Sequence, residues 1–195
     1  MLHPHTELRF VSRDIGYGVF ATQDIPCGTI MWVKDQLDRT FSKQELSNFT
    51  QANLENFLKY TYRDRNGDYF FCWDLTRYVN HSYYPNSMIT GLGFEIAIKD
   101  IKLGEEITND YGTLNIIEPF TCANGPHKRE TVKPDDLTRF HVEWDELILN
   151  AMKFQSSLPQ PLFRFLTEDQ IKSLELISAG KMSMPSILEN YFEDR

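Results

Sequence analysis

The sequence is poor in cysteine and has no long apolar run, and each of these two absences excludes a class of protein. Three cysteines cannot make a closed disulfide framework, and Cys27, Cys72 and Cys122 include no Cys-x-x-Cys pair that would indicate a metal site. No apolar stretch approaches the ~20 residues that cross a bilayer, and the N-terminal residues show no signal-peptide pattern. We therefore expect reduced thiols, no membrane partner and a cytoplasmic protein, with a nuclear or exported location left open.

Basic residues are outnumbered as well. The 20 Lys and Arg stand against 28 Asp and Glu, which gives a formal net charge of −8 over 195 residues, and neither the first 130 residues nor the remainder is basic. Binding to nucleic acid through its phosphates requires arrays of Lys and Arg, so we expect no direct nucleic-acid partner. An acidic protein favours cationic partners such as Lys-rich segments, and a role in solubility alone is an equal alternative.

The residues that are present predict one domain with a modest extension. The chain has 14 Phe, 9 Tyr and 3 Trp, enough apolar surface for a packed core. Residues 1–112 alternate short apolar stretches with turn signals, which is typical of a strand-rich body. Asn66-Gly67 predicts a tight hairpin between residues 60–62 and 69–71. A capping box formed by Ser42 and Glu45 predicts a helix over residues 42–59.

An internal repeat predicts two strand–turn–strand units of similar build. It occurs as Ala21-x-x-Asp24-Ile25-x-x-Gly28 and again as Ala97-x-x-Asp100-Ile101-x-x-Gly104. Each copy follows a strand-like stretch and precedes another apolar segment. Two short copies are too few for a solenoid, so the repeat indicates local structure only.

From about residue 134, apolar residues recur at helical spacing. The first predicted helix has an apolar face made of Leu137, Phe140, Trp144, Leu147, Ile148 and Ala151. A capping box at Thr167 and Gln170 opens a second helix, which Gly180 ends, and Pro185 suits the first turn of a third. Because amphipathic helices need an apolar surface to pack on, we expect this extension to cover the strand-rich body.

Four segments concentrate residues that core packing explains poorly. They are Gly16-Tyr17-Gly18, Arg77-Tyr78-Val79-Asn80-His81-Ser82-Tyr83-Tyr84-Pro85-Asn86, Gly104-Glu105-Glu106-Ile107-Thr108-Asn109-Asp110-Tyr111-Gly112 and Phe120-Thr121-Cys122-Ala123-Asn124-Gly125. Taken singly, they have simple interpretations as a tight turn, a structural imidazole and a core tyrosine. A Ser82–His81 nucleophile pair is disfavoured, because adjacent side chains rarely point at each other. A cysteine hydrolase that uses Cys122 and His127 lacks a residue to orient its base.

In this order and spacing, the segments resemble the SET domain family of protein lysine methyltransferases. The first looks like the family's Gly-x-Gly motif, and the third is similar to its closing Asp-Tyr-Gly motif. The second is similar to Arg-aromatic-x-Asn-His-Ser-Cys-x-Pro-Asn. The resemblance covers residues 8–125 and implies a mainly β fold, the SET-type β-clip, in which the second and third motifs cross in a pseudoknot-like manner. We therefore expect a SET domain with a short post-SET segment over residues 1–125, and a C-terminal α-helical tail over residues 126–195.

The resemblance implies methyl transfer from S-adenosylmethionine to a lysine ε-amine in a basic segment of a protein substrate, with S-adenosylhomocysteine as the product. Tyr111 would be the catalytic tyrosine, and Tyr60 aligns with the family's second channel tyrosine. The cofactor would contact Gly16, Tyr17, Gly18, Arg77, Asn80, His81, Tyr111 and Phe120. An aromatic channel beside the sulfonium would lower the pKa of the amine from about 10.4, its value in free lysine.

The sequence also departs from the family pattern. Tyr83 stands where the family has a cysteine, and of the three post-SET cysteines only Cys122 remains, with Asn124 where the second is expected. Four thiolates cannot be assembled, so we expect no zinc. Because the helical tail follows directly after Phe120, we hypothesise that it closes the active site instead. Asn109 occupies a position that is often Phe or Tyr and that influences how many methyl groups are added, so the product state stays open, as does the oligomeric state.

Two other functions stay in consideration. One is a non-catalytic SET module that acts as a binding or scaffold protein, which the presence of Asn80, His81 and Tyr111 disfavours. The other is a methyltransferase that acts on a small amine, which the sequence does not separate from an enzyme with a protein substrate.

Overall fold

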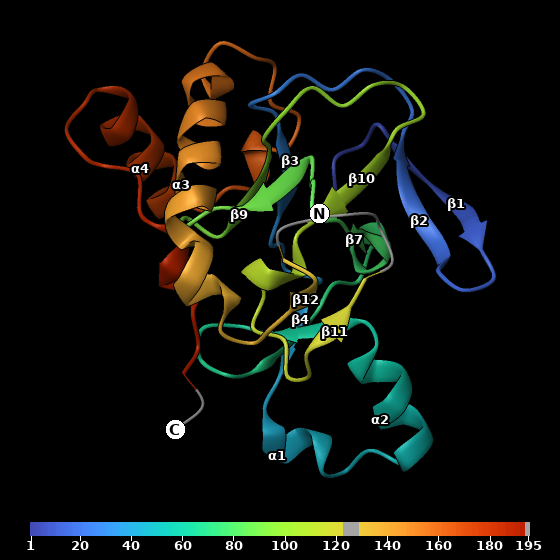
Figure 1. Cartoon of the computed structure of the whole chain (residues 1–195). Helices are drawn as coiled ribbons and strands as arrows, with labels where there is room; N and C mark the ends of the chain where they lie inside the picture. Colours follow the sequence, from blue (N-terminus) through green and yellow to red (C-terminus); the bar gives the residue numbers. More distant parts are fainter. Residues whose placement is uncertain (123–128, 194–195) are drawn as a thin grey trace.

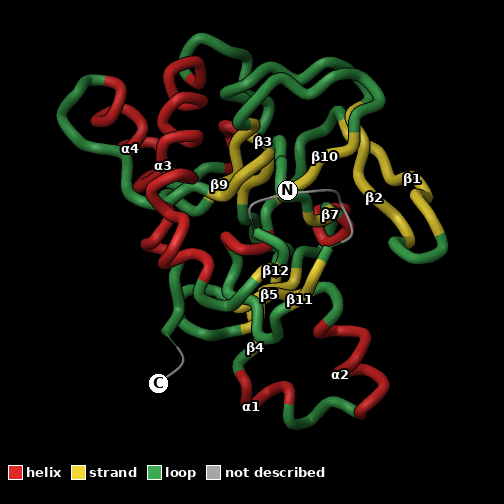
Figure 2. The backbone as a smooth tube through the Cα atoms, in the orientation of Figure 1, coloured by secondary structure: helices red, strands yellow, loops and turns green. Residues whose placement is uncertain are grey.

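We describe residues 1–122 and 129–193 from a computed structural model, in which short strands form several small sheets joined by long loops (Figures 1 and 2). The first sheet has the order β1 (Thr6–Ser12), β2 (Gly16–Ala21), β10 (Glu106–Asn109), β7 (Asn80–His81). The second has the order β3 (Ile30–Val33), β9 (Phe94–Ala97), β8 (Ser87–Ile89), and the third the order β4 (Arg39–Phe41), β6 (Tyr69–Phe71), β5 (Thr61–Arg63). The short strands β11 (Phe120–Thr121) and β12 (Thr131–Val132) pair with each other.

The two copies of the internal repeat lie antiparallel and bind each other. Ile25 and Ile101 exchange two backbone hydrogen bonds of 2.8 Å. The Gly28 amide donates to the Ala97 carbonyl, and the Gly104 amide donates to Ala21, each at 2.8 Å. One copy connects β2 to β3 and the other connects β9 to β10, so the prediction of two strand–turn–strand units is confirmed. The pairing, which the sequence did not predict, ties the first sheet to the second.

Alanine at position 28 is expected to destabilise the protein more than alanine at position 104. Both glycines have positive φ, +94° and +79°, where an L-residue costs about 1–2 kcal/mol. A Cβ on Gly28 would also lie 2.9 Å from the Ala151 carbonyl oxygen, whereas on Gly104 the nearest atom is 3.8 Å away. We expect urea unfolding to show a loss of about 1 kcal/mol for Gly104→Ala and roughly twice that for Gly28→Ala. Equal losses would mean that the helix containing Ala151 moves away from the added methyl group without losing stability.

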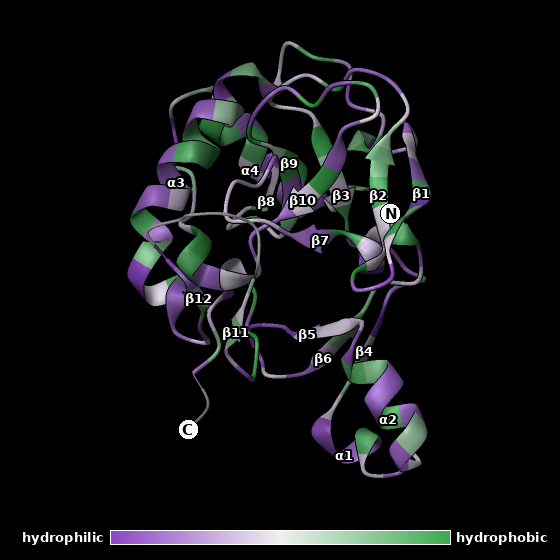
Figure 3. Cartoon of the chain, turned by 45° about the vertical axis from the view of Figure 1, so that its right-hand side comes forward, coloured by the Kyte–Doolittle hydropathy of each residue, from purple (hydrophilic) through white to green (hydrophobic). Residues whose placement is uncertain are grey.

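The prediction of one continuous helix over residues 42–59 is wrong. The chain forms α1 (Lys43–Leu46), capped by Ser42 as predicted, and after a break forms α2 (Gln51–Leu58), capped by Thr50. Phe49 and Phe57 have ring centroids 5.3 Å apart, whereas eight residues of straight helix would separate them by about 12 Å. The break therefore gathers these rings around Phe41, in a lobe that projects from the body beyond the third sheet (Figure 3). The predicted hairpin between β5 and β6 is confirmed, with Gly67 at a φ of +83°.

The later part of the chain packs helices against the sheets. The long helix α3 (Asp136–Gln155) buries Leu137, Trp144, Ile148 and Ala151 of its predicted face, whereas Leu147 stays 41% exposed. The first three share one apolar core with Val19 of β2 and Ile107 of β10. The helix α4 (Glu168–Ser178) follows the predicted capping box at Thr167.

The third predicted helix is a single 3₁₀ turn, Ile187–Asn190, and Pro185 precedes its N-cap Ser186 rather than lying in its first turn. Two further 3₁₀ turns overlap the start of the second motif and the end of the third, at Leu75–Tyr78 and Tyr111–Thr113, and a fourth spans Phe163–Phe165. Among the described residues, no helix is long and apolar enough to cross a membrane. The boundary predicted between residues 125 and 126 lies outside the described residues.

Candidate active site

The second and third sequence motifs meet through parallel pairing of β7 with β10. In this register Thr108 pairs with Asn80, and Asn109 pairs with His81. The Asn86 side chain fixes the same strand, because its amide donates to the Glu106 carbonyl and its oxygen accepts from the Thr108 amide, each at 2.8 Å. Segments about thirty residues apart in the sequence are thereby adjacent, as the resemblance implied.

The Gly-x-Gly segment, residues 16–18, lies against the Asn80 side chain and the Glu106 carboxylate, and we call this group of residues the cradle. The Asn80 amide nitrogen donates to the Tyr17 carbonyl at 3.1 Å and to the Glu106 carboxylate at 2.7 Å, while its own oxygen makes no hydrogen bond within the described residues. A Cβ at Gly18 would stand 2.2 Å from that Glu106 carboxylate, so only glycine admits this contact. Gly16 begins β2 at a φ of +87°. The role of Glu106 was missed, although its motif was recognised.

Aromatic side chains surround His81. Its ring lies 5.3 Å from Phe120 and 5.5 Å from Tyr111, with Tyr111 6.0 Å from Phe120. The His81 Nδ1 accepts a hydrogen bond of 3.1 Å from the Tyr111 backbone amide. The neighbouring Ser82 hydroxyl accepts instead from the Tyr84 amide at 3.0 Å, so the two adjacent side chains serve separate hydrogen bonds. The structure therefore brings Phe120, His81 and Tyr111 together.

Tyr111 and Tyr60 line one cavity of about 100 Å³. The Tyr111 hydroxyl donates to the Val79 carbonyl at 2.7 Å, and burial raises the pKa of this phenol to about 12, with Glu95 and Glu106 adding to the effect. The Tyr111 oxygen therefore stays protonated and keeps lone pairs for a ligand in the cavity. Tyr78 links the cavity wall to the cradle, with its ring 5.4 Å from Tyr60 and 6.3 Å from Tyr17.

Arg77 also lines this cavity, but its guanidinium is engaged with the backbone. It donates to the Trp73 carbonyl at 2.7 Å and to the Cys72 carbonyl at 3.4 Å, and it lies over the Phe71 and Tyr78 rings. These contacts hold the turn that leads into the Asn-His motif. Within the described residues, none of the interactions of Arg77 joins the Gly-x-Gly cradle.

A buried carboxylate, Glu95, lies on the wall of the same cavity and was not identified from the sequence. It is 7% exposed and accepts hydrogen bonds from Asn109 at 2.9 Å and from Ser87 at 3.2 Å. Burial raises the pKa of Glu95 to about 7, although those two hydrogen bonds oppose the shift. Glu95 is therefore a group that changes charge near neutral pH next to Tyr111.

A second missed residue, Arg129, connects the chain before β12 to the turn that carries Tyr111. Its Nη2 lies 2.5–2.6 Å from both Asp110 oxygens, and its Nη1 lies 3.0 Å from Asp136 at the start of α3. A Cβ at Gly112 would stand 2.5 Å from that Nη1, which explains why glycine follows the tyrosine. The guanidinium also lies 5.1 Å over the ring of Tyr83, the residue at the family's cysteine position.

No set of three metal-ligating side chains is assembled in residues 1–122 and 129–193. Asn124 and His127 lie outside the described residues, so the post-SET position of the former and the hydrolase alternative that used the latter are not placed.

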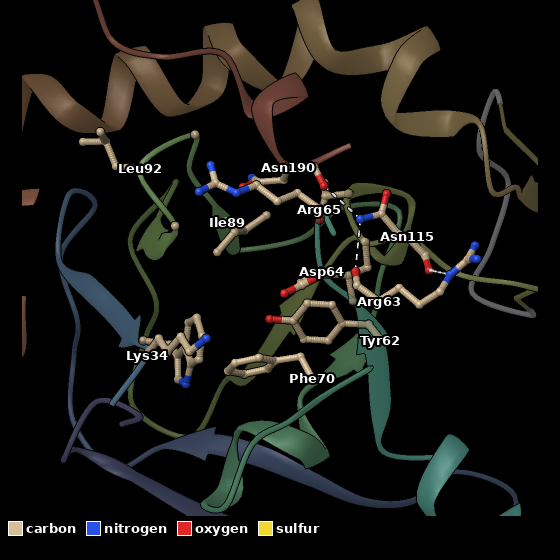
Figure 4. Close-up of a pocket in the computed structure, with 15 residues that line it drawn as sticks. Lys34, Tyr62, Arg63, Asp64, Arg65, Phe70, Ile89, Leu92, Asn115 and Asn190 are labelled. Atoms are coloured by element: carbon tan, nitrogen blue, oxygen red, sulfur yellow. Dashed lines mark hydrogen bonds between the residues drawn. The ribbon is translucent and has the colours of Figure 1, made fainter. Parts of the chain in front are cut away.

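A second cavity, of about 230 Å³, adjoins the first and shares Tyr62 and Leu114 with it. Figure 4 shows the Tyr62 hydroxyl pointing into this space, with Lys34 on the opposite side. Asn115 bridges the Arg63 carbonyl at 3.0 Å and the Asn190 carbonyl at 2.8 Å, which fixes the C-terminal segment against β5. In the part of the chain that is described, none of the site residues predicted from the sequence lines this second cavity.

One comparison with known proteins identifies the family of this chain. Residues 16–112, about half of the chain, match the SET domain, from the first glycine of the cradle to the residue after Tyr111. The chain therefore carries a SET domain and belongs to that family. No match was found among curated proteins. Among solved structures, the chain is similar to a Plasmodium falciparum protein described as a candidate histone methyltransferase, with 16% identity over 56% of this chain and 95% of that chain, and a TM-score of 0.40.

Proposed function

We propose that the protein is an S-adenosylmethionine-dependent methyltransferase that methylates a lysine ε-amine of a protein substrate. The observation that carries this proposal is that the cradle and the tyrosine cavity are built around one strand pair. Asn80 of β7 belongs to the cradle, whereas Asn109 of β10 and the following Tyr111 line the cavity. A donor molecule in the cradle and an acceptor amine in the cavity would therefore meet at Tyr111.

The residues of the cradle fit the proposed cofactor. When bound, S-adenosylmethionine supplies an electrophilic methyl group on a cationic sulfur. The Asn80 oxygen and the Glu106 carboxylate are acceptors for an ammonium group, and Gly18 leaves the backbone accessible. The rings of Phe120 and His81 offer an apolar wall for an adenine.

The residues of the cavity would position the acceptor amine. Reaction requires the amine to be neutral and aligned with the methyl group, so most of the protein's contribution is orientation and exclusion of water. Tyr60 and Val79 would enclose the aliphatic part of a lysine side chain, and the Tyr111 oxygen would lie beside the methyl group as an acceptor.

The first test is calorimetric binding of S-adenosylmethionine to the purified protein and to Asn80→Ala. We expect near-stoichiometric binding by the wild type and a loss of about 10- to 100-fold in affinity for the variant, because a hydrogen bond to a charged group is removed and Glu106 loses its partner. Asn56→Ala is the matched control, since the Asn56 amide donates only to the Ala52 carbonyl on the exposed face of α2. A folded wild-type protein that did not bind would favour the non-catalytic module.

The partner and the remaining fold details are part of the same proposal. The net charge of −8 supports a basic segment as the substrate. A labelled-methyl screen that compares basic proteins with free amines would separate a protein substrate from a small one.

The parallel β7–β10 pairing and the Asn86 bonds to β10 support the pseudoknot-like crossing of the two motifs. The ion pairs of Arg129 support a tail that closes the site from the side of α3.

A further inference from the structure

The cavity beside Tyr111 contains buried acceptor atoms that have no hydrogen bond. Asn109 is 4% exposed; its side-chain nitrogen donates to Glu95, and its side-chain oxygen has no partner among the described residues. The Thr76 hydroxyl, on the same cavity, is buried and likewise without a partner in the described part of the chain. Glu95 contributes a carboxylate that accepts only two hydrogen bonds there.

Such a group of atoms favours a ligand that brings several N–H donors. Buried polar atoms in native structures nearly always find a partner, and an unpaired one destabilises the site that holds it. The apolar part of the wall comes from Val79, Leu114, Ile116 and the rings of Tyr60 and Tyr62, which cannot satisfy these acceptors. An alkyl chain that ends in an ammonium would match both the apolar wall and the acceptors at its end.

We propose that Glu95 is the base that takes the proton from the acceptor ammonium, and that the side-chain oxygen of Asn109 then holds the neutral amine. This inference rests on the proposed methyl transfer and names the catalytic carboxylate of its substrate site. A proton leaves the ammonium nitrogen for a Glu95 oxygen and frees the nitrogen's lone pair. That pair forms the new nitrogen–carbon bond while the carbon–sulfur bond breaks and its electrons stay on sulfur. Glu95 then releases the proton to solvent as the product leaves.

The groups around Glu95 suit this role. Asp74 disfavours the ionised carboxylate and the N-terminal ammonium favours it, while the Tyr62 and Tyr111 phenols and the Cys72 thiol have pKa values raised mainly by burial and stay neutral. The cations that line the cavity are Lys59 and Arg77, the latter held by backbone carbonyls. Burial leaves the pKa of Glu95 at about 7, where a general base works well at neutral pH.

The test compares wild type, Glu95→Gln and the exposed control Glu55→Gln in labelled-methyl transfer from S-adenosylmethionine to poly-L-lysine between pH 6 and 10. The wild-type kcat/KM should rise to about pH 7 and then level off, because the enzyme removes the proton itself. The Glu95→Gln rate should fall about 100-fold at pH 7 and keep rising toward the acceptor's own pKa of about 10.4, so that the loss shrinks at high pH. Its affinity for S-adenosylmethionine should stay unchanged, and Glu55→Gln should match the wild type.

The outcomes separate this inference from the function on which it rests. An active wild type with the same pH profile as Glu95→Gln would overturn the role of Glu95 and leave the methyltransferase intact. A wild type that neither binds the cofactor nor transfers methyl groups overturns both. If Glu95→Gln does not fold, the wild-type profile decides alone, because a steady rise from pH 6 to 10 without a plateau contradicts a base inside the cavity.

Discussion

Tyr111→Phe is expected to lower the methyl-transfer rate by about 100-fold or more while leaving the affinity for S-adenosylmethionine nearly unchanged. The lost hydroxyl is held at 2.7 Å by the Val79 carbonyl inside the cavity, so its oxygen is fixed before any ligand arrives. Groups that are fixed in this way contribute to the transition state more than to binding, because no reorganisation is needed during the reaction. Stability should fall by about 1 kcal/mol, the typical contribution of one hydrogen bond.

Tyr83→Phe provides the matched control for that variant. The Tyr83 hydroxyl also donates to a backbone carbonyl, that of Glu130 at 2.9 Å, and its ring also packs on His81, with centroids 4.7 Å apart. It lies outside the cavity that Tyr111 lines. We expect a similar loss of stability and a small change in rate. A rate loss for Tyr83→Phe as large as that for Tyr111→Phe would trace the effect to packing around His81 rather than to a hydroxyl beside the reacting groups.

The part of the site that the sequence predicted consists of short motifs whose residues act locally. Gly16, Gly18 and Asn80 were predicted because each motif carries its own turn or strand, and the resemblance placed the second and third motifs, which form β7 and β10, side by side. The internal repeat was recognised for the same reason, although nothing in one copy indicates that it pairs with the other. The capping boxes at Ser42 and Thr167 were also predicted, because all their atoms lie within four residues.

The residues that the sequence missed depend on distant packing. Glu95 follows Phe94 in a strand, where alternation assigns an acidic residue to the solvent face. However, β9 is the central strand between β3 and β8, and all of its residues are buried. The break between α1 and α2 depends on Phe41, which lies in a preceding strand. Arg129 lies outside every motif, and its partners Asp110 and Asp136 come from two different elements.

Arg129→Met is expected to cause the largest loss of stability of the single substitutions considered, about 3–5 kcal/mol in the free energy of unfolding by urea. The substitution keeps most of the volume under Tyr83, Phe140 and Trp144 but leaves the Asp110 and Asp136 carboxylates, 3% and 1% exposed, without their shared cation. Two buried carboxylates of like charge are costly to desolvate and repel each other. Because Asp110 also accepts from the Gly112 amide at 2.9 Å, the turn that carries Tyr111 should loosen with it.

Two comparisons show whether the buried ion pairs cause that loss. Arg139→Met removes a cation near the start of α3, but the Arg139–Asp135 pair is exposed and four residues apart, so the expected change is only about 0.3–0.5 kcal/mol. The triple variant Arg129→Met with Asp110→Asn and Asp136→Asn should recover part of the stability, since neutral amides need no counterion. If cofactor affinity stays low in a triple variant that is again stable, the pair between Arg129 and Asp110 positions the turn that carries Tyr111 as well as stabilising it. If affinity returns with stability, the pair only anchors the C-terminal segment, and the geometry at Tyr111 is set by β7 and β10 alone.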